Sequence, residues 1–143
     1  MCMNNLKKYF VLFFLFLFIV GCPKKWYFSI IDTSNPTQPH FCFSTSEKCK
    51  GSGVKFAFID IREVNEKEEF IKKMWWLEPT SNDGVNHVIY GNIPKGYNEV
   101  IPAVPLEIGK YYSVCGIYFF RLVEVGDSIK YEIFLYSLTN RIV

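Results

Sequence analysis

Apolar and polar positions alternate with a period close to two along much of the chain after Lys25, and this pattern predicts β-strands. In the segment Val54–Val64, for example, Ile59 and Ile61 interleave with charged side chains. Further strands are expected at Trp26–Ile31, His40–Ser44, Val85–Gly91, Lys110–Val125 and Ile129–Leu138. With one more strand from a hairpin after Val64, about seven strands separated by turn residues predict an all-β protein, a small antiparallel β-sandwich.

The stretch Asn65–Pro79, with the sequence NEKEEFIKKMWWLEP, is compatible with two structures. A helix would have Asn65 as its cap, Glu68 in the capping-box position and favourable Glu–Lys pairs four residues apart. A hairpin is indicated by the β-favouring end of the stretch, MWWL, and by the stop at Pro79. We favour a hairpin over residues 65–77 whose turn is the charged run, with the helix as the alternative.

Three aromatic residues are candidates for binding a partner. Trp75 and Trp76 are neighbours, so on a strand their side chains point to opposite faces. Since each sheet of a sandwich buries one face, one indole is expected to face outward, where it either anchors a partner or lies under a loop. The stretch Asn92–Pro105 is expected to be a long irregular loop with Tyr97 at its tip, and loops of this length are often functional.

The first 21 residues have the layout of a secretory signal. Met1–Lys8 contains two lysines and no acidic residue, and Tyr9–Val20 is entirely apolar or aromatic. A helix that crosses a bilayer needs roughly 20 apolar residues, and this run has only twelve. A cleaved signal peptide is therefore favoured over an uncleaved membrane anchor.

The sequence IVGC, which ends in Gly21 and Cys22, resembles the lipobox of bacterial lipoproteins. The resemblance implies cleavage between these two residues, a diacylglycerol on the Cys22 thiol and an acyl chain on the new amino group. Two or more acyl chains hold a protein firmly at a membrane. Pro23 replaces the Asp that retains such lipoproteins at the inner membrane, so the resemblance favours the periplasmic side of the outer membrane. The expected organisation is a signal peptide over 1–21, a lipidated end and short tether over 22–25, and a sandwich over 26–143.

The charge of the chain argues against nucleic acid as a partner. The chain has 16 basic and 14 acidic residues, and two of the basic ones, Lys7 and Lys8, lie in the expected leader. The remaining chain therefore carries no formal net charge and offers no general attraction to a phosphate backbone.

Catalytic motifs do not occur in the sequence. It contains neither the G-x-S-x-G nor the H-E-x-x-H pattern, and its only glycine cluster, Gly51–Gly53, is too short to cradle a phosphate. The acidic residues around Glu66 are interleaved with lysines, which is typical of a solvated face. We therefore expect a binding protein, not an enzyme, with no cofactor beyond the covalent lipid.

The cysteines are consistent with export to an oxidising compartment. After loss of Cys2 with the signal and lipidation of Cys22, three thiols remain and allow three pairings. A disulfide between Cys42 and Cys49 is preferred because they bracket a short polar loop, and Cys115 is then a buried, inert thiol. The cysteines and the two histidines, His40 and His87, lack a recognisable zinc-site spacing, so no metal site is expected. His87 is interpreted as a structural histidine.

Leu106, Gly109 and Tyr111 form an L-x-x-G-x-Y pattern before the strongest predicted strand. The pattern resembles the tyrosine corner of immunoglobulin-like and fibronectin-like domains, in which the tyrosine hydroxyl bonds back to the backbone. Ser113 stands where antibody domains have a cysteine, so the resemblance favours a sandwich without their inter-sheet disulfide. An ordinary glycine turn before an aromatic strand is the alternative.

The segments FCFS, MWWLEP, YGNIPKGY and PLEIGKYYSV, together with the lipobox, are similar to small periplasmic lipoproteins that protect bacteria against toxins delivered by type VI secretion. The resemblance implies an immunity protein that binds a toxin and blocks it without catalysis. The alternatives are a general envelope lipoprotein with a structural or assembly role and, less favoured, a carbohydrate-binding sandwich.

Overall fold

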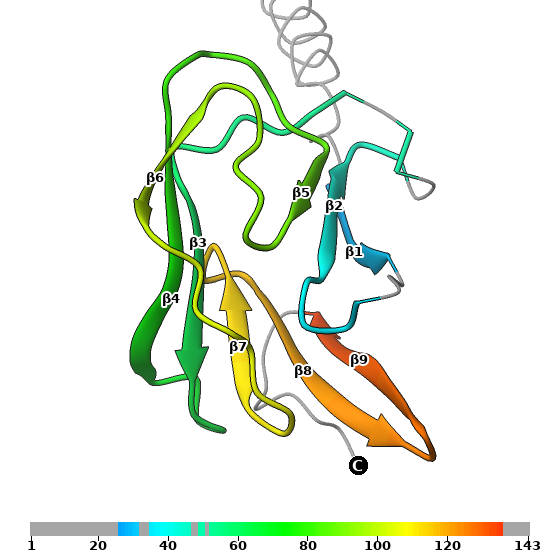
Figure 1. Ribbon diagram of the computed structural model, residues 1–143. Helices are drawn as coiled ribbons and strands as arrows, with labels where there is room; N and C mark the ends of the chain where they lie inside the picture. The colour runs from blue at the N-terminus through cyan, green and yellow to red at the C-terminus, as the bar shows by residue number, and fades with distance from the viewer. Residues whose placement is uncertain (1–25, 32–34, 47–48, 51, 136–143) are drawn as a thin grey trace, which may run out of the picture.

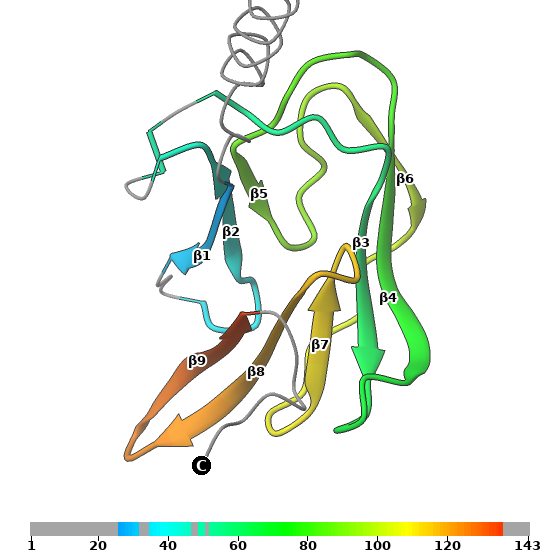
Figure 2. The same ribbon diagram turned by 180° about the vertical axis from the view of Figure 1, so that it is seen from behind.

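Two antiparallel sheets make up the described part of the chain, residues 26–31, 35–46, 49–50 and 52–135 of a computed structural model (Figures 1 and 2). Over these residues the strands are β1 (Tyr27–Ile31), β2 (His40–Ser44), β3 (Ile59–Val64), β4 (Phe70–Pro79), β5 (His87–Ile89), β6 (Tyr97–Ile101), β7 (Tyr111–Val114), β8 (Tyr118–Val125) and β9 (Ser128–Leu135). The smaller sheet has the strand order β1-β2-β5, and the larger has the order β6-β4-β3-β7-β8-β9.

The distribution of strands between the sheets is that of an immunoglobulin-like sandwich. The first, second and fifth strands form one sheet, as strands A, B and E do in immunoglobulin domains. In the other sheet β3, β7 and β8 are neighbours, as strands C, F and G are, and β4 lies beside β3 in the position of strand C′. The expected all-β sandwich is therefore confirmed, with β6 and β9 extending the larger sheet at its two edges.

The core lies between the sheets and is rich in aromatic side chains. Phe41 of β2 meets Phe120 of β8 edge to face at 5.6 Å, and Phe28 of β1 stacks on Tyr118 at 4.3 Å between ring centroids. Both sheets contribute to one continuous cluster because alternate residues of each strand point inward. The largest fully buried side chains are Trp75, Tyr112, Phe41, Phe43, Phe120, Ile59, Ile61, Met74, Leu77, Leu122, Val88 and Val114.

The stretch over residues 65–77 is a hairpin, as favoured from the sequence. The Asn65 side-chain oxygen accepts hydrogen bonds from the backbone N–H groups of Lys67 and Glu69, and Glu68 has a positive φ of 65°. This turn leads β3 into β4, which pairs with β3 on one side and β6 on the other. The Glu–Lys pairs of the alternative helix would contribute only about 0.2–0.5 kcal/mol each. The hydrogen bonds of β4 to two neighbouring strands and the burial of the Trp75 indole outweigh them.

Two boundaries differ from the sequence expectation. The strand expected over Lys110–Val125 is two strands, β7 and β8, because the chain reverses at Cys115 and Gly116, whose φ values are 53° and 67°. Such positive φ values at two successive residues define a hairpin turn that matches strand twist. The stretch Asn92–Pro105, expected to be irregular, contains β6, which pairs with the edge of β4. Nine strands therefore replace the expected seven in the described residues.

Several predictions concern residues outside the described part. The signal peptide over 1–21, the cleavage site at Gly21, the lipidation site Cys22 and the tether to residue 25 all precede Trp26. The last eight residues of the expected domain, 136–143, also lie outside it. Within the described residues, no helix has the length and apolar character needed to span a bilayer.

Candidate functional site

The adjacent residues Trp75 and Trp76 lie on opposite faces of the larger sheet, as predicted. The pairing of β3 with β4 has an irregularity after Ile61, where Trp75 is the partner of Ile61 but Lys73 is the partner of Arg62. The extra residue, Met74, lets both Met74 and Trp75 face the core and leaves Lys73 and Trp76 on the outside.

Trp75 is a core residue with no exposed surface, so of the two candidate indoles it is the one that cannot anchor a partner. Its ring meets Tyr90 edge to face at 5.3 Å. Its Nε1–H donates a 2.8 Å hydrogen bond to Oε1 of Glu99 on β6. Trp75 therefore stabilises the fold and holds the Glu99 carboxylate in place.

Trp76 remains a candidate because its half-buried ring is on the outer surface of the larger sheet. The Lys73 ammonium lies 3.3 Å from the centre of the indole ring, a close cation–π contact. Opposite Trp76 on β3 is Asp60, which is only 1% exposed and forms an ion pair with Arg62. The indole is thus flanked by charged groups whose positions are set by the sheet register.

Aromatic side chains continue across the same surface, which we call the outer aromatic face. In one row across four neighbouring strands, Phe70 pairs with Val64, Val64 with Tyr111, and Tyr111 with Arg121. Cross-strand partners project to the same side of a sheet, so these side chains are neighbours. The outer aromatic face consists of Val64, Phe70, Lys73, Trp76, Tyr111, Phe119, Arg121 and Phe134.

Arg121 and Phe70 give this face its chemical character. The Arg121 guanidinium carbon is 5.2 Å from the centre of the Tyr111 ring and 6.0 Å from that of Phe134, and its Nη1 donates to the Tyr111 hydroxyl at 2.9 Å. Phe70 is 60% exposed at the start of β4. The face therefore combines fixed aromatic–cation pairs with an exposed ring, whereas the solvent side of an antiparallel sheet is commonly polar.

Tyr97 is not at a loop tip, and the prediction of an exposed aromatic anchor there is wrong. It is the first residue of β6, its side chain is only 6% exposed, and it belongs to the main core. Burial raises the pKa of its hydroxyl above the ordinary value. The sequence signal that was missed is the short β-favouring segment that follows Gly96 and pairs with β4.

The tyrosine corner is present, but Tyr112 makes it in place of the expected Tyr111. The Tyr112 hydroxyl accepts a 2.7 Å hydrogen bond from the Glu107 N–H and donates to the Glu107 carbonyl at 3.3 Å. Leu106 is buried and Gly109 has a φ of 82°, as a corner requires. Tyr111 points to the outer aromatic face because its neighbour on the strand points inward.

A cavity of about 420 Å³ opens beside β6. It lies between the segment 35–38, the turn at Tyr90 and Gly91, and the segment 99–105. The Glu99 carboxylate, held by the Trp75 indole, supplies a negative charge to its wall. The residues that line it are Asn35, Thr37, Gln38, Tyr90, Gly91, Glu99, Pro102, Ala103, Val104 and Pro105. Sequence reasoning missed this cavity because its three segments are far apart in the chain.

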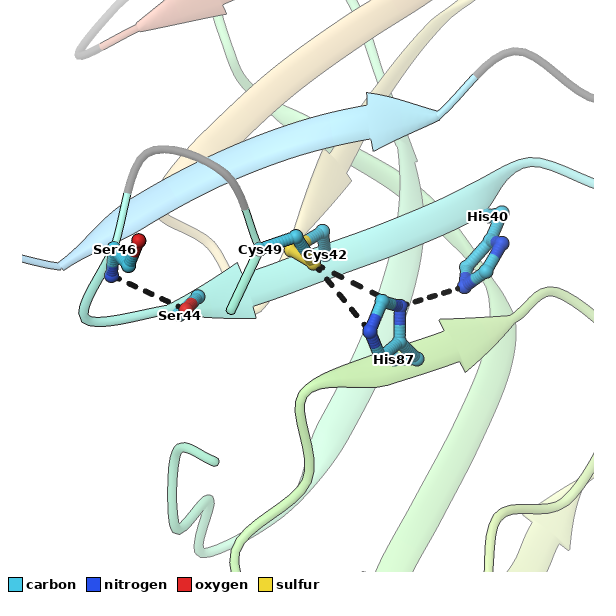
Figure 3. Close-up of a disulfide and its surroundings, with 6 residues drawn as sticks. All are labelled: His40, Cys42, Ser44, Ser46, Cys49 and His87. Atoms are coloured by element: carbon cyan, nitrogen blue, oxygen red, sulfur yellow. Dashed lines mark hydrogen bonds between the residues drawn. A yellow bond between two sulfur atoms is a disulfide. The ribbon is translucent and has the colours of Figure 1, made fainter. Parts of the chain in front are cut away.

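Cys42 and Cys49 form the expected disulfide, with Cα atoms 6.0 Å apart (Figure 3). Both histidines lie beside it: His40 Nε2 is 3.0 Å from His87 Nδ1, and the Cys49 sulfur is 3.6–3.7 Å from the two His87 ring nitrogens. Burial, and then the neighbouring His87, lower the pKa of His40. His87 is exposed on the outer surface of the smaller sheet, where its ring contacts His40 and Cys49, and its interpretation as a structural histidine stays a prediction.

Cys115 is a free, half-buried thiol in the turn between β7 and β8. Burial raises the pKa of its thiol to about 11, and a hydrogen bond with the backbone of Asp60 partly opposes this change. A thiol of this kind is almost entirely protonated at neutral pH and is a poor nucleophile. The thiol is therefore half-buried where the sequence predicted a buried one, and its inertness stays a prediction.

The fold and the surface define an immunoglobulin-like β-sandwich with an aromatic outer face and a disulfide beside two histidines. Comparison with known proteins finds no protein-family model that matches the chain, no matching curated protein and no matching solved structure. Function is therefore inferred from the residues of the chain itself.

Proposed function

We propose that this chain is a membrane-anchored periplasmic lipoprotein whose sandwich binds a toxin delivered by type VI secretion and blocks it. The lipobox ending in Gly21 and Cys22 supports the anchor, and three acyl chains on one cysteine hold a protein firmly at a membrane. The resemblance of several sequence segments to immunity lipoproteins supports the toxin as the partner. Blocking by an occluding interface needs no catalysis by this protein.

The outer aromatic face is the observation that supports binding to a protein partner. Trp, Tyr and Arg dominate the binding energy of protein interfaces, and here Trp76, Tyr111 and Arg121 lie on one surface. The strands hold these side chains in place, so little conformational entropy is lost when a partner binds. A standard interface buries about 1,600 Å² in total, and a six-stranded sheet is wide enough to supply one half of it.

Lys73 and Arg121 supply positive charge to this face. Arg121 is already paired with Glu132 on the neighbouring strand, so Lys73, whose ammonium lies over the Trp76 ring, is the cation with which an acidic group of a partner could pair. We therefore expect the matching toxin surface to combine acidic side chains with apolar ones. Such complementarity increases the association rate and the specificity of the complex.

The experiment that tests the proposal is affinity capture from an attacking strain's secreted proteins, followed by growth competition. The lipidated protein should retain a toxin, and deletion of its gene should make cells sensitive to siblings that carry the secretion system. Trp76→Ala should weaken toxin binding by about 30-fold or more, the effect of losing an interface hot spot. Ile93→Ala, at an exposed site away from the face, is the matched control.

Two outcomes would contradict the proposal. Unchanged survival of the deletion strain in competition would leave the general envelope role as the better explanation. A toxin that binds Trp76→Ala as tightly as the native chain would remove the outer aromatic face from the interface. Separately, Cys22→Ser should release the protein from the membrane fraction, and retention there would contradict the lipid anchor.

A second candidate, carbohydrate binding, is favoured by the cavity beside β6. Its wall contains amide, hydroxyl and carboxylate side chains, from Asn35, Thr37, Gln38 and Glu99, which suit sugar hydroxyl groups. Pull-down with envelope glycans tests it. Retention that is lost in Glu99→Gln would support this function, and absence of retention would exclude it.

A further inference from the structure

The disulfide and the two histidines lie together on the outward surface of the smaller sheet (Figure 3). Cys42 of β2 is the direct cross-strand partner of His87 of β5, and His40 lies two residues before Cys42 on the same face. Cys49 reaches this face from the loop after β2 and bonds to Cys42. Four groups that commonly bind transition metals therefore converge from two strands and one loop.

The distances from the Cys49 sulfur to His87 and from His87 to His40 are close to those of a tetrahedral zinc site, whereas the two sulfurs, bonded in the disulfide, must separate to about 3.8 Å after reduction. Zinc binds sulfur at about 2.3 Å and imidazole nitrogen at about 2.0–2.1 Å, so a sulfur and a nitrogen ligand lie about 3.6 Å apart in a tetrahedral site. The Cys49 sulfur is 3.7 Å from His87 Nδ1, which is 3.0 Å from His40 Nε2. The ligand atoms of Cys42, Cys49 and His87 all lie within 4.8 Å of one another.

We propose that Cys42, Cys49, His87 and His40 bind one zinc ion when the disulfide is reduced. The two thiolates and two imidazoles form the ligand set typical of structural zinc. This inference revises the expectation of no metal site, which rested on ligand spacing in the sequence. The spacing is unusual because His40 precedes Cys42 on one strand and His87 lies on another strand.

The change between the two states is a balanced thiol–disulfide exchange. A dithiol supplies two electrons and two protons: its own two thiols become a disulfide, and the Cys42–Cys49 bond becomes two thiols. Zinc then displaces the two thiol protons and binds both sulfurs with the two neutral imidazoles. Oxidation by a disulfide reverses the exchange and releases the zinc, so metal binding and the disulfide exclude each other.

The surroundings of the cluster are suited to this exchange. His87 is exposed and His40 is half-buried, so a metal ion from solution reaches both without opening the core. Cys42 is buried beneath Cys49, while Cys49 is half-exposed and is the sulfur that an external thiolate can attack. A bound zinc ion would link Cys49 to β2 as the disulfide does.

The test uses the full chain in detergent, with and without dithiothreitol as the dithiol and with zinc or cobalt as the metal. The reduced protein should bind one metal ion per chain, and with cobalt it should show thiolate charge-transfer and tetrahedral visible bands. The oxidised protein should bind at least about 100-fold more weakly, because only two imidazoles remain as ligands. Equal binding in the two states would overturn the proposal.

Variants separate the four ligands from the rest of the molecule. His87→Ala should weaken metal binding by the reduced chain by about 100-fold, and His40→Ala should also weaken it. Cys115→Ser is the matched control, because it removes a thiol outside the cluster and should leave metal binding unchanged. Loss of binding in Cys115→Ser, or full binding by His87→Ala, would contradict the assignment.

A second measurement applies if reduction unfolds the chain. Zinc should then restore the far-ultraviolet circular dichroism of the oxidised protein, since metal binding is coupled to folding. It should also protect Cys42 and Cys49, mapped by mass spectrometry, from N-ethylmaleimide. A chain that zinc neither refolds nor protects would overturn the proposal.

Discussion

The Tyr112 hydroxyl bonds to both backbone groups of Glu107, accepting from its N–H at 2.7 Å and donating to its carbonyl at 3.3 Å. This contact joins the start of β7 to the segment that leads into it. Tyr111, one residue earlier, bonds instead to Arg121 on the outer aromatic face. Two adjacent tyrosines therefore have different roles, one in holding the connection between β6 and β7 and one at the surface.

Replacement of Tyr112 tests this distinction. Tyr112→Phe keeps the buried ring but loses both hydrogen bonds, and we expect the free energy of unfolding to fall by about 1–2 kcal/mol. Tyr111→Phe is the matched control and should change stability by less than about 0.5 kcal/mol. Urea unfolding monitored by circular dichroism measures both, and an equal loss in the two variants would contradict the corner assignment.

The two tryptophans should respond differently to truncation. Trp75→Ala removes a fully buried indole and its bond to Glu99, and such changes cost about 3–5 kcal/mol. Trp76→Ala should cost about 1 kcal/mol, because its ring is half-exposed and packs mainly against Lys73. Thermal unfolding of the two variants measures both losses of stability. A larger loss in Trp76→Ala than in Trp75→Ala would contradict the placement of Trp75 in the core.

Cys115 should react slowly with alkylating reagents in the folded protein. With its pKa raised to about 11 by burial, only about 0.1% is thiolate at pH 8, compared with roughly 10% of an ordinary thiol of pKa near 9. The rate of modification by iodoacetamide should rise tenfold per pH unit up to about pH 11. Mass spectrometry of the native and urea-unfolded chains measures it, and rapid native labelling at pH 8 would contradict the burial of this thiol.

The same difference in pKa predicts a loss of stability at alkaline pH. The unfolded chain releases the Cys115 proton near pH 9 and the folded chain only near pH 11, so the contribution of this group is complete below pH 9 and decreases as the pH rises to 11. Urea unfolding at several pH values should show this decline. Cys115→Ser should lessen this decline. If the free energy of unfolding falls as steeply with pH in that variant, the decline is due to other groups.

The disulfide should contribute to stability through the short loop that it closes. Cys42 and Cys49 are seven residues apart, and closing a loop of this size stabilises a chain by about 2 kcal/mol. The double variant Cys42→Ala/Cys49→Ala should lose about this amount in urea unfolding under oxidising, metal-free conditions. Addition of dithiothreitol should then leave the variant unchanged while it destabilises the native chain.

The hairpin over 65–77 illustrates how far the sequence could predict the fold. Its charged turn and β-favouring end were visible locally, and these features were sufficient to favour strands over a helix. The irregularity that brings both Met74 and Trp75 to the core was not visible, because it arises from the pairing of β4 with β3. The sequence indicated that Trp75 and Trp76 face opposite ways, but not which of them is buried.

The errors at Tyr97 and Tyr111 have a related cause. Each prediction placed an aromatic residue by its distance from a glycine or a proline along the chain. Whether such a residue faces inward depends on strand register, and a shift of one residue reverses the face. Tyr97 begins a strand that pairs with the edge of β4, and Tyr112 takes the inward position that the pattern assigned to its neighbour.

The alternation of apolar and polar residues by itself determined that this chain forms an antiparallel β-sandwich, because side-chain direction along a strand is a local property. The short spacing of Cys42 and Cys49 likewise indicated their disulfide. Only the tertiary structure decided which aromatic residues share the outer face and that His40 and His87 meet beside that disulfide. These neighbours are brought together by pairing between strands that are distant in the chain, and no local pattern specifies that pairing.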